Sequence, residues 1–178
     1  MKKYLGLLTL ILASCSQTQE ARRPISQTSG TFIKESIDRN KKLIQFEEKQ
    51  IDSIIKNNPE TEYVSSADGF WYAYTTKNTT DTIHPKRGDI AYFDYEIKDL
   101  KGAIIYSKEE LKPKTYYVDK EDIIIGLRNG IKLMKKNETV TFLFPSHKAF
   151  GYHGDDKKIQ PNQPLQITVT LHTFKPEN

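Results

Sequence analysis

The sequence of 178 residues predicts an α+β domain, in which an antiparallel half-barrel sheet wraps around one short helix and a long amphipathic helix precedes the sheet. From Gly69 to the end of the chain, β-rich runs recur between Gly, Pro, Asn and Asp residues. The last run alternates apolar and polar residues, which is typical of a strand with one face on a core. A single helical segment, 126–134, interrupts these runs, and we expect strands over 70–74, 90–97, 104–107, 116–118, 139–144 and 165–174.

The N-terminus has the features of a bacterial lipoprotein signal. Lys2 and Lys3 precede an apolar run over 5–13, which is far shorter than the roughly 20 residues needed to span a bilayer. The run ends Leu-Ala-Ser-Cys, a lipobox pattern in which Cys15 becomes the lipidated first residue. We therefore predict a signal peptide over 1–14 and a membrane anchor on Cys15, the alternative being a plain secretory signal followed by an incidental cysteine. Because no aspartate follows Cys15, we expect the outer membrane, with the protein facing the periplasm.

The charge balance argues against nucleic acid as a partner. The signal peptide carries two of the 27 basic residues, so 25 basic and 23 acidic side chains remain in the mature chain. The four histidines include no close pair on a helix, and His147 and His153 lie six residues apart with no Cys or carboxylate at ligand spacing. Neither a metal nor a cofactor is therefore predicted.

A polar segment and a long helix follow the lipobox. Residues 15–30 are rich in Gln, Ser, Thr and Arg and have too few apolar side chains to pack, which predicts a flexible tether. Over 31–58, isoleucines such as Ile44 and Ile51 recur at seven-residue spacing on one face. This amphipathic helix must bury its apolar stripe, either against its own domain or against the same helix of a second subunit in a homodimer. Asn40 and Glu47 lie on the stripe and weaken a strict coiled coil.

Several motifs of the segment 69–178 follow one another in a characteristic order. An apolar loop and short helix, DIIIGLRNGIKLM from Asp122, precede an apolar strand, an aromatic-Gly corner at Phe150 and a proline loop before the last strand. In this order and spacing the segment resembles the FKBP family of peptidyl-prolyl isomerases. With the lipobox, the string ARRPIS and the long helix added, the whole chain is similar to the gliding-motility-associated peptidyl-prolyl isomerase lipoproteins.

The resemblance implies a dry apolar pocket that holds a prolyl ring and favours the twisted X-Pro bond, with the Ile124 N–H donating to a substrate carbonyl. Such chemistry needs no nucleophile and no cofactor. The resemblance also implies a lipid-anchored isomerase that assists the folding of exported proteins, among them those of the gliding machinery. Its partners would be proline-containing segments of these proteins. The positions that match the family's pocket are Tyr95, Ile105, Tyr106, Ile123, Ile124, Leu127, Phe150, Ile159 and Ile167.

Four positions depart from the family's pattern. Leu127 stands where the family has a pocket tryptophan, Tyr106 where it has an aspartate, Phe150 where it has a tyrosine and Asp155 where it has a loop histidine. Tyr106 and Phe150 thus remove a carboxylate and a hydroxyl, and the resemblance then implies low activity. A second hypothesis is a chaperone or structural lipoprotein that binds proline-containing segments with little or no turnover.

Overall fold

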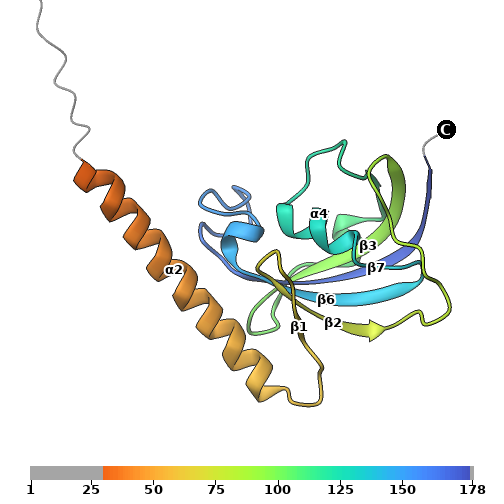
Figure 1. The fold of residues 1–178 in the computed structure, drawn as a ribbon, viewed down its shortest axis with the longest axis horizontal. Coiled ribbons are helices and arrows are strands. Elements are labelled where there is room, and N and C mark those ends of the chain that lie inside the picture. Colours follow the sequence, from red (N-terminus) through yellow and green to blue (C-terminus); the bar gives the residue numbers. More distant parts are fainter. Residues whose placement is uncertain (1–29, 177–178) are drawn as a thin grey trace, which may run out of the picture. The chain divides into compact units, whose positions relative to one another are not determined.

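The computed structural model describes residues 30–176, and the chain divides into two units, 1–36 and 37–178. The predicted signal peptide, Cys15 and the tether up to residue 29 lie outside the described residues. Helix α2 (Gly30–Asn57) begins in the first unit and continues in the second, which also contains the strands (Figure 1). Among residues 30–176, no helix has the length and apolar character needed to cross a membrane.

One seven-stranded sheet, antiparallel at every pairing, forms the body of the second unit. The strand order is β1 (Val64–Ser65), β2 (Trp71–Thr76), β6 (Glu138–Phe144), β7 (Leu165–Pro176), β3 (Asp89–Asp99) and β4 (Ile104–Tyr106), and β5 (Lys114–Tyr117) also pairs with β3. β5 pairs with the first half of β3, and β4 pairs with its second half. The last strand of the chain, β7, therefore lies between β6 and β3.

The core lies between this sheet and helix α4 (Ile125–Ile131) (Figure 1). The period of two along β7 buries four apolar side chains completely, which are Leu165, Ile167, Val169 and Leu171. The alternation predicted for this strand is therefore confirmed. Helix and sheet approach closely at Gly126, where a Cβ atom would lie 2.5 Å from the Phe144 ring and 2.8 Å from the Lys148 carbonyl oxygen. Only a residue without a side chain fits this contact.

The predicted fold class is confirmed, and the structure differs from the prediction in detail. A second short helix, α3 (Lys108–Leu111), and a 3₁₀-helix, η2 (Ser146–Lys148), join the single helix predicted. Neither spans enough residues to show a helical period. β1 is missing from the predicted strands because two residues give no alternation. α4 ends at Ile131, three residues before the predicted end, because the Met134 N–H bonds to the carbonyl three residues back and tightens the chain into a turn.

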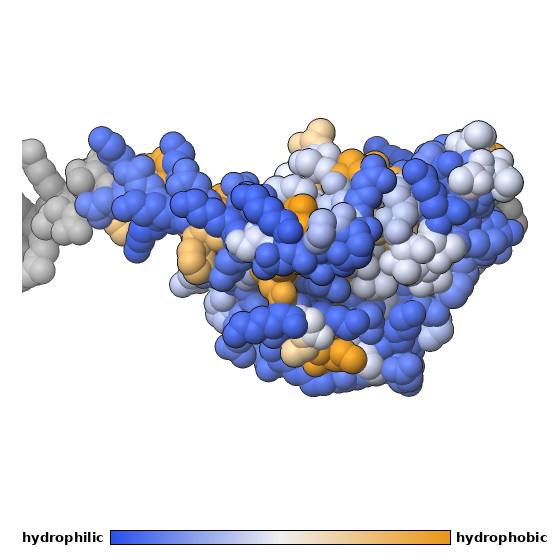
Figure 2. Space-filling model, turned by 90° about the horizontal axis from the view of Figure 1, so that it is seen from below, coloured by the Kyte–Doolittle hydropathy of each residue, from blue (hydrophilic) through white to orange (hydrophobic). Residues whose placement is uncertain are grey.

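Within the second unit, one side of α2 packs against the domain. Ile51 is fully buried, and Glu47 is only 1% exposed although it carries a carboxylate. Ile37 and Phe46 remain 48% and 60% exposed. On the face that Figure 2 presents, apolar residues form small patches within a mainly hydrophilic surface. The domain therefore covers part of the apolar stripe of α2, which is the first of the two alternatives that the sequence left open. Another part of the stripe remains exposed.

Candidate functional site

A cavity of about 610 Å³ opens between β3, β5 and the N-terminal end of α4. Its lining consists largely of aromatic and aliphatic side chains, with polar groups from Lys114, Thr115 and Asp122 among them. The lining residues are Phe93, Tyr95, Lys114, Thr115, Tyr116, Asp122, Ile123, Ile124, Leu127, Ala149 and Phe150. A smaller cavity of about 270 Å³ adjoins it, because Tyr95 and Phe150 line both.

The structure brings six of the nine predicted pocket residues to these two cavities. Five line the larger cavity, namely Tyr95, Ile123, Ile124, Leu127 and Phe150. Tyr106 lines the smaller one. The other three do not line either cavity: Ile105 is partly buried beside the core, and Ile159 and Ile167 are core residues with 2% and 0% exposure.

Local structure explains how the lining residues reach the cavity. On β3 the period of two places Phe93 and Tyr95 on the same face of the sheet, where their rings lie 5.6 Å apart. Ile124 is the N-cap residue of α4, with φ −54° and ψ 138°, and no side chain caps the helix there. Leu127 lies one turn further along α4 and is 4% exposed, so it belongs to both the core and the cavity floor.

Sequence reasoning missed several lining residues. Phe93 could have been predicted, because it lies two residues before Tyr95 on the same strand and therefore faces the same side of the sheet. Tyr116 is almost completely buried in β5, and its hydroxyl accepts the Asp119 N–H at 3.0 Å, so its ring forms part of the wall. Lys114 belongs to a short exposed run that gives no sequence signal.

The larger cavity has one phenol in its wall whose ionisation is disfavoured. Burial raises the pKa of Tyr95 above its ordinary value of 10.0. The phenol therefore remains neutral at physiological pH and can act as a hydrogen-bond donor without bringing charge into the cavity.

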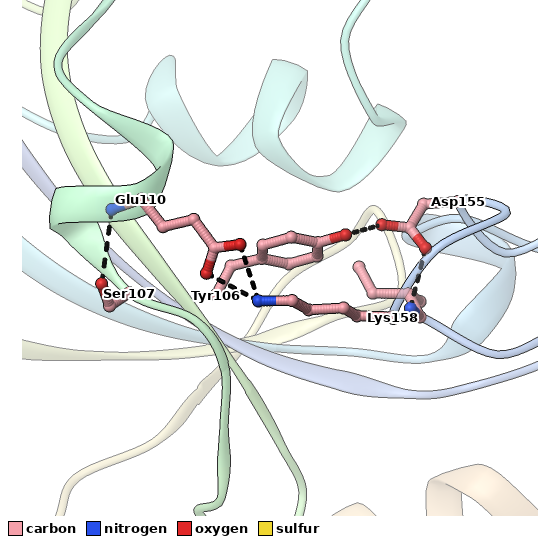
Figure 3. A network of polar contacts seen from close by, with 6 residues as sticks. Tyr106, Ser107, Glu110, Asp155 and Lys158 are labelled. Atoms are coloured by element: carbon pink, nitrogen blue, oxygen red, sulfur yellow. Dashed lines mark hydrogen bonds and ion pairs between the residues drawn. The ribbon is translucent and has the colours of Figure 1, made fainter.

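Tyr106 and Asp155 form a hydrogen bond in the smaller cavity (Figure 3). The Tyr106 hydroxyl donates to Asp155 Oδ2, and Asp155 Oδ1 accepts the N–H groups of Lys157 at 3.0 Å and Ile159 at 2.8 Å. The hydrogen bond to Asp155 raises the pKa of Tyr106. Burial alone would raise the pKa of Asp155, but the Tyr106 hydroxyl and the backbone N–H groups outweigh it and lower that pKa. The two departures from the family's pattern thus act as one pair, which supplies both a carboxylate and a hydroxyl.

An ion pair continues this network across the surface (Figure 3). Lys158 Nζ lies 2.6 and 2.7 Å from the two carboxylate oxygens of Glu110 on α3, and 4.7 Å from the centre of the Tyr106 ring. The pair joins α3 to the loop between β6 and β7. The loop that carries Asp155 is therefore fixed to the β4–α3 segment at two points.

A third cavity, of about 580 Å³, contains none of the residues predicted for the pocket. It is lined mainly by polar residues of 60–64 and 73–77. Within the described part of the chain, no group of three or more His, Cys, Asp or Glu side chains is placed to hold a metal ion.

Comparisons with known proteins connect this site to a family. The model of the FKBP-type peptidyl-prolyl cis-trans isomerases matches residues 81–172. A probable FKBP-type peptidyl-prolyl cis-trans isomerase, FkpA of Neisseria meningitidis serogroup B, is 27% identical over 146 residues, which are 80% of this chain and 52% of that protein. The chain therefore spans about half of the length of this curated relative.

Two solved structures share the fold. FkpA from Escherichia coli is 22% identical, with a TM-score of 0.61, 98% of this chain covered and 82% of that one. A peptidyl-prolyl cis-trans isomerase from Pseudomonas syringae pv. tomato is 19% identical, with a TM-score of 0.60, 76% of this chain covered and 95% of the other. At these identities the structures show a common fold. The family model, which matches more than half of the sequence, shows that this chain belongs to the FKBP-type peptidyl-prolyl cis-trans isomerases.

Proposed function

We propose that this chain catalyses the cis–trans isomerisation of X-Pro bonds in polypeptides. The observation that carries the proposal is the apolar cavity between β3 and α4, in which Tyr95, Ile123, Ile124, Leu127 and Phe150 lie together. Rotation about an X-Pro bond is slow because it breaks amide resonance, with a barrier of about 18–20 kcal/mol. A cavity that binds the twisted bond better than the planar one lowers this barrier, with tenfold in rate for each ~1.4 kcal/mol of preference.

Each part of the cavity has a distinct role in this mechanism. The rings of Tyr95 and Phe150 and the aliphatic side chains of Ile123 and Leu127 enclose the prolyl ring and exclude water. The Ile124 N–H, at the uncapped beginning of α4, donates to the carbonyl of the bound peptide. No bond to the protein forms or breaks, so proton transfer and a nucleophile are unnecessary.

A second candidate function is binding of proline-containing segments with little turnover. The Tyr106 hydroxyl, which lines the smaller cavity, already donates to Asp155, and Phe150 has no hydroxyl. A bound peptide therefore finds no free hydroxyl donor at either of these two positions. This arrangement favours binding over catalysis.

One pair of measurements separates the two functions. Isomerisation of a chromogenic tetrapeptide with one Leu-Pro bond is followed with a protease that cleaves only the trans form, and binding of the same peptide is followed by NMR titration. A catalyst accelerates cleavage in proportion to protein concentration, whereas a binder gives a saturable titration without acceleration. Phe150→Ala should reduce either signal, and Tyr152→Ala, at a side chain that is 75% exposed and outside both cavities, is the matched control.

We further propose that the mature protein is anchored to the outer membrane through lipidated Cys15 and acts there on exported proteins, including those of gliding motility. The short apolar run and the lipobox support the anchor, and the resemblance of the whole chain to the gliding-motility-associated lipoproteins supports the client class. Metabolic labelling with a fatty-acid analogue tests the anchor. The client class is tested by measuring gliding in a strain that lacks the protein. Gliding should be slower in this strain and should recover when the wild-type chain is supplied.

A homodimer formed through α2 is the remaining proposal. In its support, four large apolar side chains of this helix are between 48% and 65% exposed, namely Phe32, Ile33, Ile37 and Phe46. The double variant Ile37→Glu and Phe46→Glu should convert a dimer into a monomer, because each carboxylate would be buried without a partner. Light scattering that finds a wild-type monomer at every concentration would contradict this proposal.

A further inference from the structure

Helix α2 contributes a buried carboxylate to the segment that forms one wall of the larger cavity. Glu47 is 1% exposed, and its two oxygens accept both hydrogen-bond donors of Ser146, the N–H at 2.8 Å and the Oγ–H at 2.7 Å. Ser146 itself is 2% exposed. The two residues are 99 positions apart in the sequence and both belong to the second unit.

This contact is more than a favourable surface interaction. Burial of a carboxylate costs several kcal/mol unless its lone pairs are satisfied, and hydrogen bonds to a charged group are about twice as strong as neutral ones. Ser146 is the first residue of η2, and no side chain of its own segment caps that helix. Glu47 therefore satisfies an N–H group at the beginning of η2 from another element of the fold.

Ser146 in turn fixes the residues that follow it. Its carbonyl oxygen accepts the N–H groups of Ala149 at 2.9 Å and Gly151 at 2.8 Å, on either side of Phe150. Ala149 and Phe150 both line the larger cavity. A continuous set of hydrogen bonds thus runs from the Glu47 carboxylate through Ser146 to the backbone around Phe150.

We infer that Glu47 is a positioning residue, which acts through Ser146 to hold Phe150 against the bound prolyl ring. This inference rests on the proposed isomerase function and assigns part of the site to a helix that lies before residue 81, where the family match begins. Loss of the carboxylate frees the backbone around Phe150 and displaces its ring from the cavity wall. A displacement of about 1 Å in a positioned group can cost up to about a hundredfold in rate.

Four variants of the full chain test this role in the tetrapeptide assay. Glu47→Ala should lower kcat/KM by about tenfold, and Ser146→Ala, which keeps the backbone donor, by less. Glu47→Gln should restore most of the activity, because its amide oxygen accepts the N–H and its amide nitrogen donates to the hydroxyl. Val140→Ala, a core truncation on β6 outside both cavities, is the control for lost stability.

A double-mutant cycle separates positioning from a general loss of structure. If Glu47 acts through Phe150, the combined variant Glu47→Ala and Phe150→Ala should be no slower than Phe150→Ala alone. The inference would be overturned if the losses of kcat/KM in Glu47→Ala and Phe150→Ala multiplied in the combined variant. It would also be overturned if Val140→Ala, at the same stability as Glu47→Ala, lost as much kcat/KM. If Glu47→Ala does not fold, the same cycle with Ser146→Ala decides.

Hydrogen exchange keeps this test separate from that of the proposed function. In Glu47→Ala the amides of Ala149 and Gly151 should exchange about tenfold faster than in wild type, with Glu47→Gln close to wild type. A wild-type chain that neither binds nor isomerises the peptide refutes the proposed function, and the exchange rates then still show whether Glu47 orders this segment. Unchanged exchange in Glu47→Ala would refute the role of Glu47 even in an active enzyme.

Discussion

Leu127 and Ile131 offer a matched comparison between a core residue that lines the cavity and one that does not. Both belong to α4, one turn apart, and both are part of the same buried cluster, with exposures of 4% and 0%. Only Leu127 also lines the larger cavity. Truncation to alanine should therefore affect stability in both variants but activity in only one.

The structure sets the expected magnitudes. A buried Leu→Ala or Ile→Ala change costs about 2–5 kcal/mol, and the cost rises with the volume of the space left behind. Ile131→Ala should fall in the upper part of this range because its surroundings are closed. Leu127→Ala should fall in the lower part because its space opens into the cavity and water can fill it. A missing methylene in an apolar pocket is worth about 1–3 kcal/mol in the transition state, so Leu127→Ala should lose at least about tenfold in kcat/KM.

Urea denaturation gives the free energies of unfolding, and the tetrapeptide assay gives kcat/KM at a temperature where both variants are folded. We expect Ile131→Ala to retain wild-type kcat/KM per folded molecule despite its greater loss of stability. The reasoning is refuted if Ile131→Ala loses as much activity as Leu127→Ala, or if Leu127→Ala keeps full activity.

Three further predictions concern ionisation, loop order and attachment. The pKa of Asp155 is lowered and that of Tyr106 is raised, so their hydrogen bond should persist between pH 3.8 and 10.0 and be lost as Asp155 protonates below this window or Tyr106 ionises above it. In Asp155→Asn, the change in tyrosine absorbance that reports ionisation of Tyr106 should occur at a lower pH than in wild type. An unshifted titration would contradict the pairing. Burial and Lys148 lower the pKa of His147 below 6.5, although Glu47 opposes them. The unfolded chain therefore takes up the proton at a higher pH than the folded chain does, and stability should fall as the pH drops through 6.5. Thermal melts of His147→Asn should lack this loss of stability, and an equal loss in the variant would exclude His147 as its source. Cys15→Ala should move the protein from the detergent phase to the aqueous phase, and partitioning equal to that of wild type would argue against lipidation.

Sequence patterns anticipate the parts of this fold that depend on local periodicity. The alternation along β7 and the apolar loop before α4 are both visible in consecutive residues, and the structure has a strand and a helix there. Ile159 and Ile167 match family motifs but lie in the core, because a motif gives the type of residue and not the depth at which the side chain ends.

Contacts between distant positions leave no such pattern. Tyr106 and Asp155 are 49 residues apart, and each taken alone reads as a lost family residue. Glu47 reads as a defect in an apolar stripe until the structure places it against Ser146. The first pair depends on how the loop after β6 meets β4, and the second on where α2 packs against the domain, and neither contact is visible in consecutive residues.

The central place of β7 has a consequence for the order in which this domain acquires its structure. β3 pairs with β7 along Asp89–Asp99, and β6 pairs with β7 from Glu138 to Phe144. A ribosome releases the N-terminus first, so β3 and β6 both emerge before residues 165–176, and the two halves of the sheet have no common strand until β7 follows. Pairings between such distant segments also carry the loop-closure cost that slows folding. The sheet therefore cannot be completed before β7 is available, and a chain that stops before Leu165 leaves one edge of β3 and one edge of β6 unpaired, open to pairing with other chains.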